Sequence, residues 1–235
     1  GSFTPGTRRV VVRARYMRMT QANLTPAHAH LRYILRDGTT REGLPGHLYD
    51  ADGAADARSF LSRSEKDPHQ FRFIVAPEDS ARLANQEPVI RDLMKQMETD
   101  LDTKLDWVAV DHFNTGHPHT HVVVRGRDER GQDLIIARDY ISHGIRGRMQ
   151  ELVTLELGPE TELERIVRQT NEVGQQRFTG LDRGILTRMS DNVLVVASSP
   201  MDPQRHALQM GRLRKLESLG LAKEERAGVW TLDAE

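Results

Sequence analysis

Two adjacent segments with strand-like sequence bring four of the ten histidines within ten residues of each other. Residues 106–113 and 119–125 are rich in β-branched and aromatic residues, and the link between them contains Gly116 and Pro118. This pattern predicts an antiparallel hairpin. We therefore expect a sheet with a histidine-rich turn. The histidines at or beside this turn are His112, His117, His119 and His121.

The composition is that of a folded protein without cysteine chemistry. The 235 residues carry 33 lysines and arginines against 34 aspartates and glutamates, and 37% are hydrophobic. This length allows one large or two small domains, and the apolar content excludes a mostly disordered chain. Because cysteine is absent, a disulfide scaffold and a thiol nucleophile are excluded, and any metal must be bound by His, Asp or Glu.

Two further features concern location. No apolar run approaches the roughly 20 residues that a membrane span requires. The Gly1-Ser2 start resembles a cloning remnant, and no signal segment follows it. We expect no membrane span and a cytoplasmic location in a bacterium. The balanced charge argues against a generally basic nucleic-acid coat, but it is compatible with a local basic groove.

The order of elements indicates an α+β fold, a mostly antiparallel sheet with helices packed on it. Alternation and turn residues predict strands at 8–18, 71–75, 106–113, 119–125 and 133–138. Caps, prolines and apolar spacing predict helices at 26–36, 58–65, 79–104 and 140–156. Pro88 lies inside the third of these helices, so we expect a break or kink there.

The C-terminal part has a different pattern. A helix predicted at 205–219 is followed by Gly220 and two short strands, which suggests a winged-helix-like unit. We place the boundary between residues 1–165 and 166–235. The helix carries Arg205, Arg212, Arg214 and Lys215 and could approach duplex DNA. A structural cap or a protein-contact module explains the same pattern.

Strand geometry predicts a three-histidine metal site. His119 and His121 share one face of a strand, about 7 Å apart. His112, on the preceding strand, comes opposite that pair if the strands form a hairpin. Three protein ligands with open positions are typical of a catalytic metal. His117 offers the same spacing with His119, but Pro118 belongs at a strand entrance, so we place His117 in the loop, where it could contact a phosphate.

The hairpin sequence from His112 to Val124 resembles the third motif of conjugative relaxases of the HUH superfamily, in the Mob and T-DNA-transfer branch. Residues 31–38 (LRYILRDG) are similar to the first motif of that family, whose tyrosine attacks DNA. The resemblance covers about residues 8–157. It implies that Tyr33 is the nucleophile and that His112, His119 and His121 hold a divalent ion, Mg or Mn in use and Zn or Ni in a crystal.

The same resemblance implies an activity and partners. Such an enzyme nicks single-stranded DNA at a transfer origin, stays attached through a 5′-phosphotyrosine and later rejoins the strand. The partners would be the origin DNA, duplex DNA through the C-terminal unit, and accessory relaxosome proteins. On its residues alone, Tyr33 fits equally well a packing role at the rim of the core.

The chain departs from the family pattern at two positions. Asn114 stands where the family has Asp, which leaves the orienting carboxylate in question, and Arg125 stands where it has Asn. Arg125 shares a strand face with His119 and His121, so we expect it to hold a phosphate. Arg13 and Arg15 are further candidates for DNA contacts. His30 and Asp111 are weak candidates for a base, and a regular strand turns Asp111 to the face opposite His112.

Two other function classes fit parts of the sequence. A metal-dependent phosphodiesterase that uses activated water explains the histidines without Tyr33. A winged-helix DNA-binding regulator with an incidental metal site makes the C-terminal unit primary.

Overall fold

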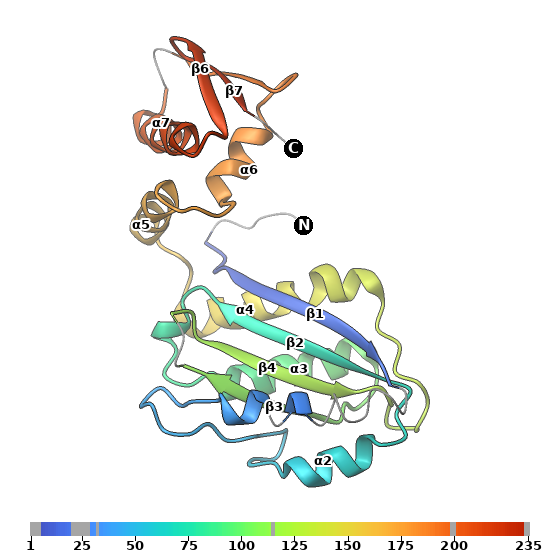
Figure 1. Ribbon diagram of the computed structural model, residues 1–235. Helices are drawn as coiled ribbons and strands as arrows, with labels where there is room; N and C mark the ends of the chain where they lie inside the picture. The colour runs from blue at the N-terminus through green and yellow to red at the C-terminus, as the bar shows by residue number, and fades with distance from the viewer. Residues whose placement is uncertain (1–5, 20–28, 32, 114–115, 198–200, 233–235) are drawn as a thin grey trace. The chain divides into compact units, whose positions relative to one another are not determined.

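The chain divides into two compact units, residues Gly1–Glu160 and Thr161–Glu235. The computed structural model (Figure 1) describes residues 6–19, 29–31, 33–113, 116–197 and 201–232. The division falls five residues before the predicted boundary. That these units are two separate domains stays a prediction.

The first unit is built on a four-stranded antiparallel sheet with the strand order β1-β2-β4-β3. The predicted α+β fold, with helices packed on a mostly antiparallel sheet, is confirmed. The hairpin of β3 and β4 has the register expected from the histidine pattern. The strands are β1 (Val10–Arg18), β2 (His69–Pro77), β3 (Trp107–His112) and β4 (His119–Arg125).

One face of this sheet packs on two long helices, α3 (Glu87–Leu101) and α4 (Ile145–Leu157), which Figure 1 shows behind the strands. Alternate strand residues such as Phe73, Val122 and Ala109 point to this face and are buried in the main core. Removal of these apolar side chains from water is the main stabilising contribution to the unit.

The other face is covered only in part. Residues 29–31 and 33–36 are helical, and α2 (Ala57–Ser64) begins at Asp56, whose side chain accepts a hydrogen bond of 2.7 Å from the backbone N–H of Ser59. These helices pack on β3 and β4 through a second apolar cluster. That cluster includes Leu31, Ile34, Leu48, Phe60, Val108, Val110 and Val123. On the β1 side of the same face, the side chains Arg13 and Arg15 are exposed.

Three sequence predictions need correction. The helix predicted at 79–104 is a 3-10 turn at Ser80–Arg82 followed by α3. The break expected near Pro88 is present, but it lies before this proline, which occupies the first turn of an unkinked α3. A proline is tolerated there because the first backbone N–H groups of a helix have no partner within it. The strand predicted at 133–138 is a single bridge between Arg127 and Asp133. The helix predicted at 140–156 begins with a π-helical turn, Tyr140–Gly144, and continues as α4.

The second unit consists of three helices and a small antiparallel sheet in the order β5-β7-β6. The predicted order of helix, glycine and hairpin is present at its end, while the winged-helix assignment stays a prediction. Its apolar core includes Leu213 and Trp230. The elements are α5 (Glu162–Val173), α6 (Gly180–Leu186), β5 (Val193–Val195), α7 (Pro203–Ser218), β6 (Ala222–Arg226) and β7 (Val229–Leu232).

The side chain of Arg212 on α7 is turned into the second unit, contrary to its predicted approach to duplex DNA. Its side chain is buried and donates hydrogen bonds of 2.7 Å and 2.8 Å to the two carboxylate oxygens of Asp182 on α6. Further donors reach backbone carbonyls, such as that of Gln175. The arginine therefore joins the helices of this unit internally.

Among the helices in the described parts of the chain, none combines the length and the apolar character needed to cross a membrane.

Candidate metal centre beside the Tyr33 helix

The hairpin register places three histidines on one face of the sheet. His112 on β3 is the direct partner of His119 on β4, and His121 follows two residues later on the same face. The ring centroids lie 4.6–5.2 Å apart in the three pairs. One nitrogen from each ring can be chosen so that all three lie within 4.8 Å of one another.

Backbone carbonyls fix the orientation of two of these rings. Nε2 of His112 donates a hydrogen bond of 2.8 Å to the carbonyl of Ile34, so its Nδ1 carries the lone pair. Nδ1 of His119 donates 3.0 Å to the carbonyl of His117, so its Nε2 carries the lone pair. Metal-binding histidines are held in the same way, through the ring nitrogen that does not bind the ion.

The donor set fits a divalent cation. Nε2 of His119 lies 3.2 Å from Nε2 of His121. Two nitrogen ligands at about 2.1 Å from one tetrahedral ion would be roughly 3.4 Å apart. Without an ion, two facing lone pairs repel, so one nitrogen must carry a proton that an ion would replace. His119 and His121 are therefore spaced as ligands of a single ion, and His112 offers a nitrogen within 4.8 Å of both.

Burial keeps two of the rings neutral. Burial lowers the pKa of His112, although the hydrogen bond to Ile34 acts in the opposite direction. Burial, with His112 and His119 nearby, lowers the pKa of His121 to about 3. Neutral imidazole is the form that binds metal ions. His112 and His121 are thus in their ligand form at neutral pH.

Tyr33 lies on the helix that covers the triad side of the sheet. Its side chain is 54% exposed, and the guanidinium carbon of Arg36 lies 5.4 Å from the ring centroid. Its hydroxyl is close enough to the carboxylate of Asp37 to help lower the pKa of that carboxyl. The next residue, Ile34, supplies the carbonyl that holds His112. The helix that carries the predicted nucleophile is therefore bonded directly to one predicted metal ligand.

Asp37 is a site residue that the sequence reasoning missed. Arg36 donates to it at 2.9 Å and lowers the pKa of its carboxyl, and the Tyr33 hydroxyl and the nearby His112 act in the same direction. Asp37 therefore lies within electrostatic reach of both Tyr33 and the triad. The available signal was its spacing, because residues four apart lie on one face of a helix.

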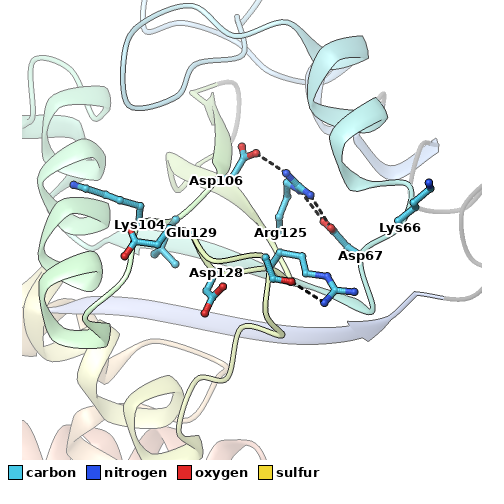
Figure 2. Close-up of a pocket in the computed structure, with 10 residues that line it drawn as sticks. Lys66, Asp67, Lys104, Asp106, Arg125, Asp128 and Glu129 are labelled. Atoms are coloured by element: carbon cyan, nitrogen blue, oxygen red, sulfur yellow. Dashed lines mark hydrogen bonds and ion pairs between the residues drawn. The ribbon is translucent and has the colours of Figure 1, made fainter.

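The predicted phosphate contact of Arg125 is not supported. Arg125 shares the strand face of His119 but lies six residues farther along β4, about 20 Å away at the usual rise per residue. Figure 2 shows its guanidinium between Asp106 and Asp67, at N–O distances of 2.8–2.9 Å. These carboxylates offset its charge, and Arg63 also binds Asp106.

Asp111 also lies away from the triad. Its carboxylate accepts hydrogen bonds from the hydroxyls of Tyr49 at 2.9 Å and Thr120 at 2.6 Å, on the opposite face of the sheet. The role of a base beside Tyr33 is therefore not assigned to it. Asn114 lies outside the described residues. His117 is exposed and contributes its carbonyl to His119, while its contact with a phosphate stays a prediction.

A groove begins at the triad and crosses β4, β2 and β1. Its volume is about 410 Å³, and both predicted DNA contacts on β1, Arg13 and Arg15, line it together with His121. His30 lines it as well, as does Arg72, a basic residue that the sequence reasoning missed. The ring of His30 lies 6.5 Å from that of His121, measured between centroids. No local sequence signal locates Arg72, because only the pairing of β1 with β2 makes it the direct partner of Arg15.

Among known proteins, no family model matches the chain, and no curated protein matches it. A solved structure similar to the chain is the MobM relaxase domain, of the MOBV class, bound to transfer-origin DNA of plasmid pMV158 with manganese. The two chains are 14% identical, and the match has a TM-score of 0.39 and covers 66% of this chain and 90% of that domain.

Proposed function

We propose that the chain nicks and rejoins single-stranded DNA at a transfer origin through a covalent 5′-phosphotyrosine on Tyr33. The observation that carries the proposal is the convergence of His112, His119 and His121 with a direct bond from His112 to the Tyr33 helix. A relaxase needs these two parts together, an ion that polarises a phosphate and a nucleophile beside it.

In the proposed reaction, the phenol oxygen of Tyr33 attacks the scissile phosphorus in line. The new bond joins phosphorus to the tyrosine oxygen, the bond from phosphorus to the 3′ oxygen breaks, and the 3′ oxygen takes up a proton. Asp37, whose carboxyl pKa the Tyr33 hydroxyl helps to lower, is our candidate to receive or pass on the proton of the phenol. The number of phosphoester bonds is unchanged, so the 3′ hydroxyl can reverse the reaction.

The three histidines would hold Mg²⁺ or Mn²⁺. When bound, the ion supplies Lewis-acid polarisation of the phosphate oxygens. Ile34 and His117, through their backbone carbonyls, keep two of the ligand rings in the required tautomer. Burial of His112 and His121 favours their neutral form.

A covalent-adduct assay tests the proposal. The full chain is incubated with Mn²⁺ and single-stranded DNA from the transfer origin of the element that encodes it, and is then run on a denaturing gel. We expect a slower protein band that carries the DNA, lost in Tyr33→Phe and with EDTA. Tyr16→Phe is the matched control, because Tyr16 is 58% exposed and lies on β1. An adduct that persists in Tyr33→Phe would contradict the proposal.

The second candidate is a phosphodiesterase that uses activated water. It is favoured by the exposure of Tyr33, since an exposed tyrosine does not require a covalent role. This enzyme would cleave DNA in the Tyr33→Phe variant and leave no adduct. The same gel therefore separates the two candidates.

The finer predictions on partners remain proposals. Duplex DNA would bind the second unit through exposed basic side chains of α7 such as Arg205 and Arg214. Accessory relaxosome proteins and a cytoplasmic location follow from the proposed function.

A further inference from the structure

We propose that Arg72 and Arg15 form a phosphate-binding site in the groove beside the histidine triad, and that this site holds a backbone phosphate next to the one that is cut. The ligand class is the phosphodiester backbone of a single strand. The inference rests on the proposed function for its choice of DNA, while the site itself is argued from the groove.

The pairing of β1 with β2 puts two like charges opposite each other. Arg15 is the direct partner of Arg72, and in the next row on the same face Arg13 is the partner of Ile74. Like charges at directly opposed positions destabilise a strand pair. None of the described residues that line the groove carries a carboxylate to offset them. A bound anion would remove this repulsion.

Arg72 has a donor without a partner. Its Nε donates 2.9 Å to the side-chain oxygen of Gln70, whereas its Nη2 is buried and has no hydrogen-bond partner. Leaving a buried donor unsatisfied is costly, and more so for a charged group. Burial and Arg15 lower the pKa of Arg72 to about 10, as expected for a cation that lacks a counter-charge, and the side chain remains charged at neutral pH.

The position of Arg72 suits a phosphate adjacent to the reacting one. His121 is the partner of Ile74, and Arg72 lies two residues from Ile74 on β2. Diagonal neighbours of this kind are about 7–8 Å apart. Arg72 therefore lies beside the triad and not at the ion. A DNA strand with one phosphate at the triad could place a neighbouring phosphate at Arg72. A guanidinium suits this task because it can donate two parallel hydrogen bonds to one phosphate.

Binding of DNA without catalysis tests the site. Fluorescence anisotropy measures the affinity of the full chain for labelled oligothymidylate in EDTA, over a range of salt concentrations. We expect Arg72→Gln and Arg15→Gln each to weaken binding at least tenfold. Each should also reduce the slope of log affinity against log salt by about 0.7, the change for one phosphate contact on a single strand. Arg72→Lys should fall between wild type and Arg72→Gln, because it keeps the charge but loses the paired donors.

The control variant is Arg130→Gln, which removes the same charge from an exposed turn outside the groove. It should bind as wild type does. If Arg72→Gln does not fold, Arg15→Gln decides, since Arg15 is exposed on β1. Wild-type affinity and salt slope in both groove variants would overturn the inference, even if the adduct assay succeeds. Weakened binding in the groove variants without any adduct in wild type would instead count against the proposed function alone.

Discussion

The ring of His112 donates a hydrogen bond of 2.8 Å from Nε2 to the backbone carbonyl of Ile34, the residue that follows Tyr33. This bond joins a strand and a helix that lie 78 residues apart in the sequence. It orients a proposed metal ligand and fixes the helix of the proposed nucleophile with one contact. Changes on either side should therefore affect both the metal centre and the reaction.

Removal of a triad ring should abolish metal binding. In His112→Ala we expect the affinity for Mn²⁺, measured by isothermal titration calorimetry, to fall by more than about 100-fold, since loss of an outer partner alone costs 10- to 100-fold. His143→Ala is the control, because His143 is exposed and pairs with Asp139. Equal affinities in wild type and His112→Ala would show that the ion does not bind at the triad.

Asp37 should matter for the reaction but not for the metal. In Asp37→Asn we expect adduct formation to slow by about 100-fold, the low end of the range for a positioned acid or base. The affinity for Mn²⁺ should stay close to that of wild type, because Asp37 is not one of the three proposed ligands. Asp139→Asn removes an exposed carboxylate elsewhere and should change neither quantity. An unchanged rate in Asp37→Asn would remove Asp37 from the mechanism.

The end of the Tyr33 helix should be sensitive to one added methyl group. A Cβ on Gly38 would lie 2.5 Å from Cγ2 of the buried Val110, so Gly38→Ala must displace the helix end or the strand. We expect a loss of about 1–3 kcal/mol in the free energy of unfolding, together with slower adduct formation. Gly147→Ala in α4 meets no atom within 4 Å and should instead stabilise by about 0.5–1 kcal/mol. Urea unfolding gives both values.

The second unit should lose stability in acid through Asp182. Burial alone would raise the pKa of this carboxyl, but Arg212 and Thr179 hold it below its usual value. A carboxyl with a depressed pKa in the folded state contributes stability above about pH 4, and this contribution is lost as the pH falls through the folded-state value. Unfolding of the unit can be followed by Trp230, which is fully buried, in a Trp107→Phe background.

Arg212→Met tests the same ion pair at neutral pH. It leaves a buried carboxylate without its partner, so we expect a loss of about 3–5 kcal/mol in the free energy of unfolding. The control Arg214→Met changes an exposed residue on the same helix. Stability of Arg212→Met equal to that of this control would show that the pair contributes little.

Much of the sheet and of the triad was predictable, because both depend on local patterns. The period of two in residues 119–125 and the short link before them define the hairpin, and the hairpin alone brings His112 opposite His119. The start of α3 was misplaced because sequence alone does not tell a proline inside a helix from one in its first turn. The strand expected at 133–138 was wrong because a single bridge leaves that segment without a partner strand.

The parts of the site that depend on long-range pairing could not be predicted. Arg72 is separated from Arg15 by more than 50 residues, and nothing local shows that they oppose each other. Arg125 has the right alternation but lies beside Asp67 and Asp106, which the sequence places far from it. Arg212 has a basic helical context typical of a DNA contact, yet folding buries it against Asp182.

Mass spectrometry of the trapped adduct tests directly whether Tyr33 is the residue that becomes joined to DNA. The full chain is reacted with origin DNA and Mn²⁺, digested with nuclease and trypsin, and the peptide that retains a nucleotide is sequenced by fragmentation. We expect the nucleotide on the phenol oxygen of Tyr33, in the peptide that ends at Arg36. A nucleotide on any other residue, or cleaved DNA with no modified peptide, would contradict it.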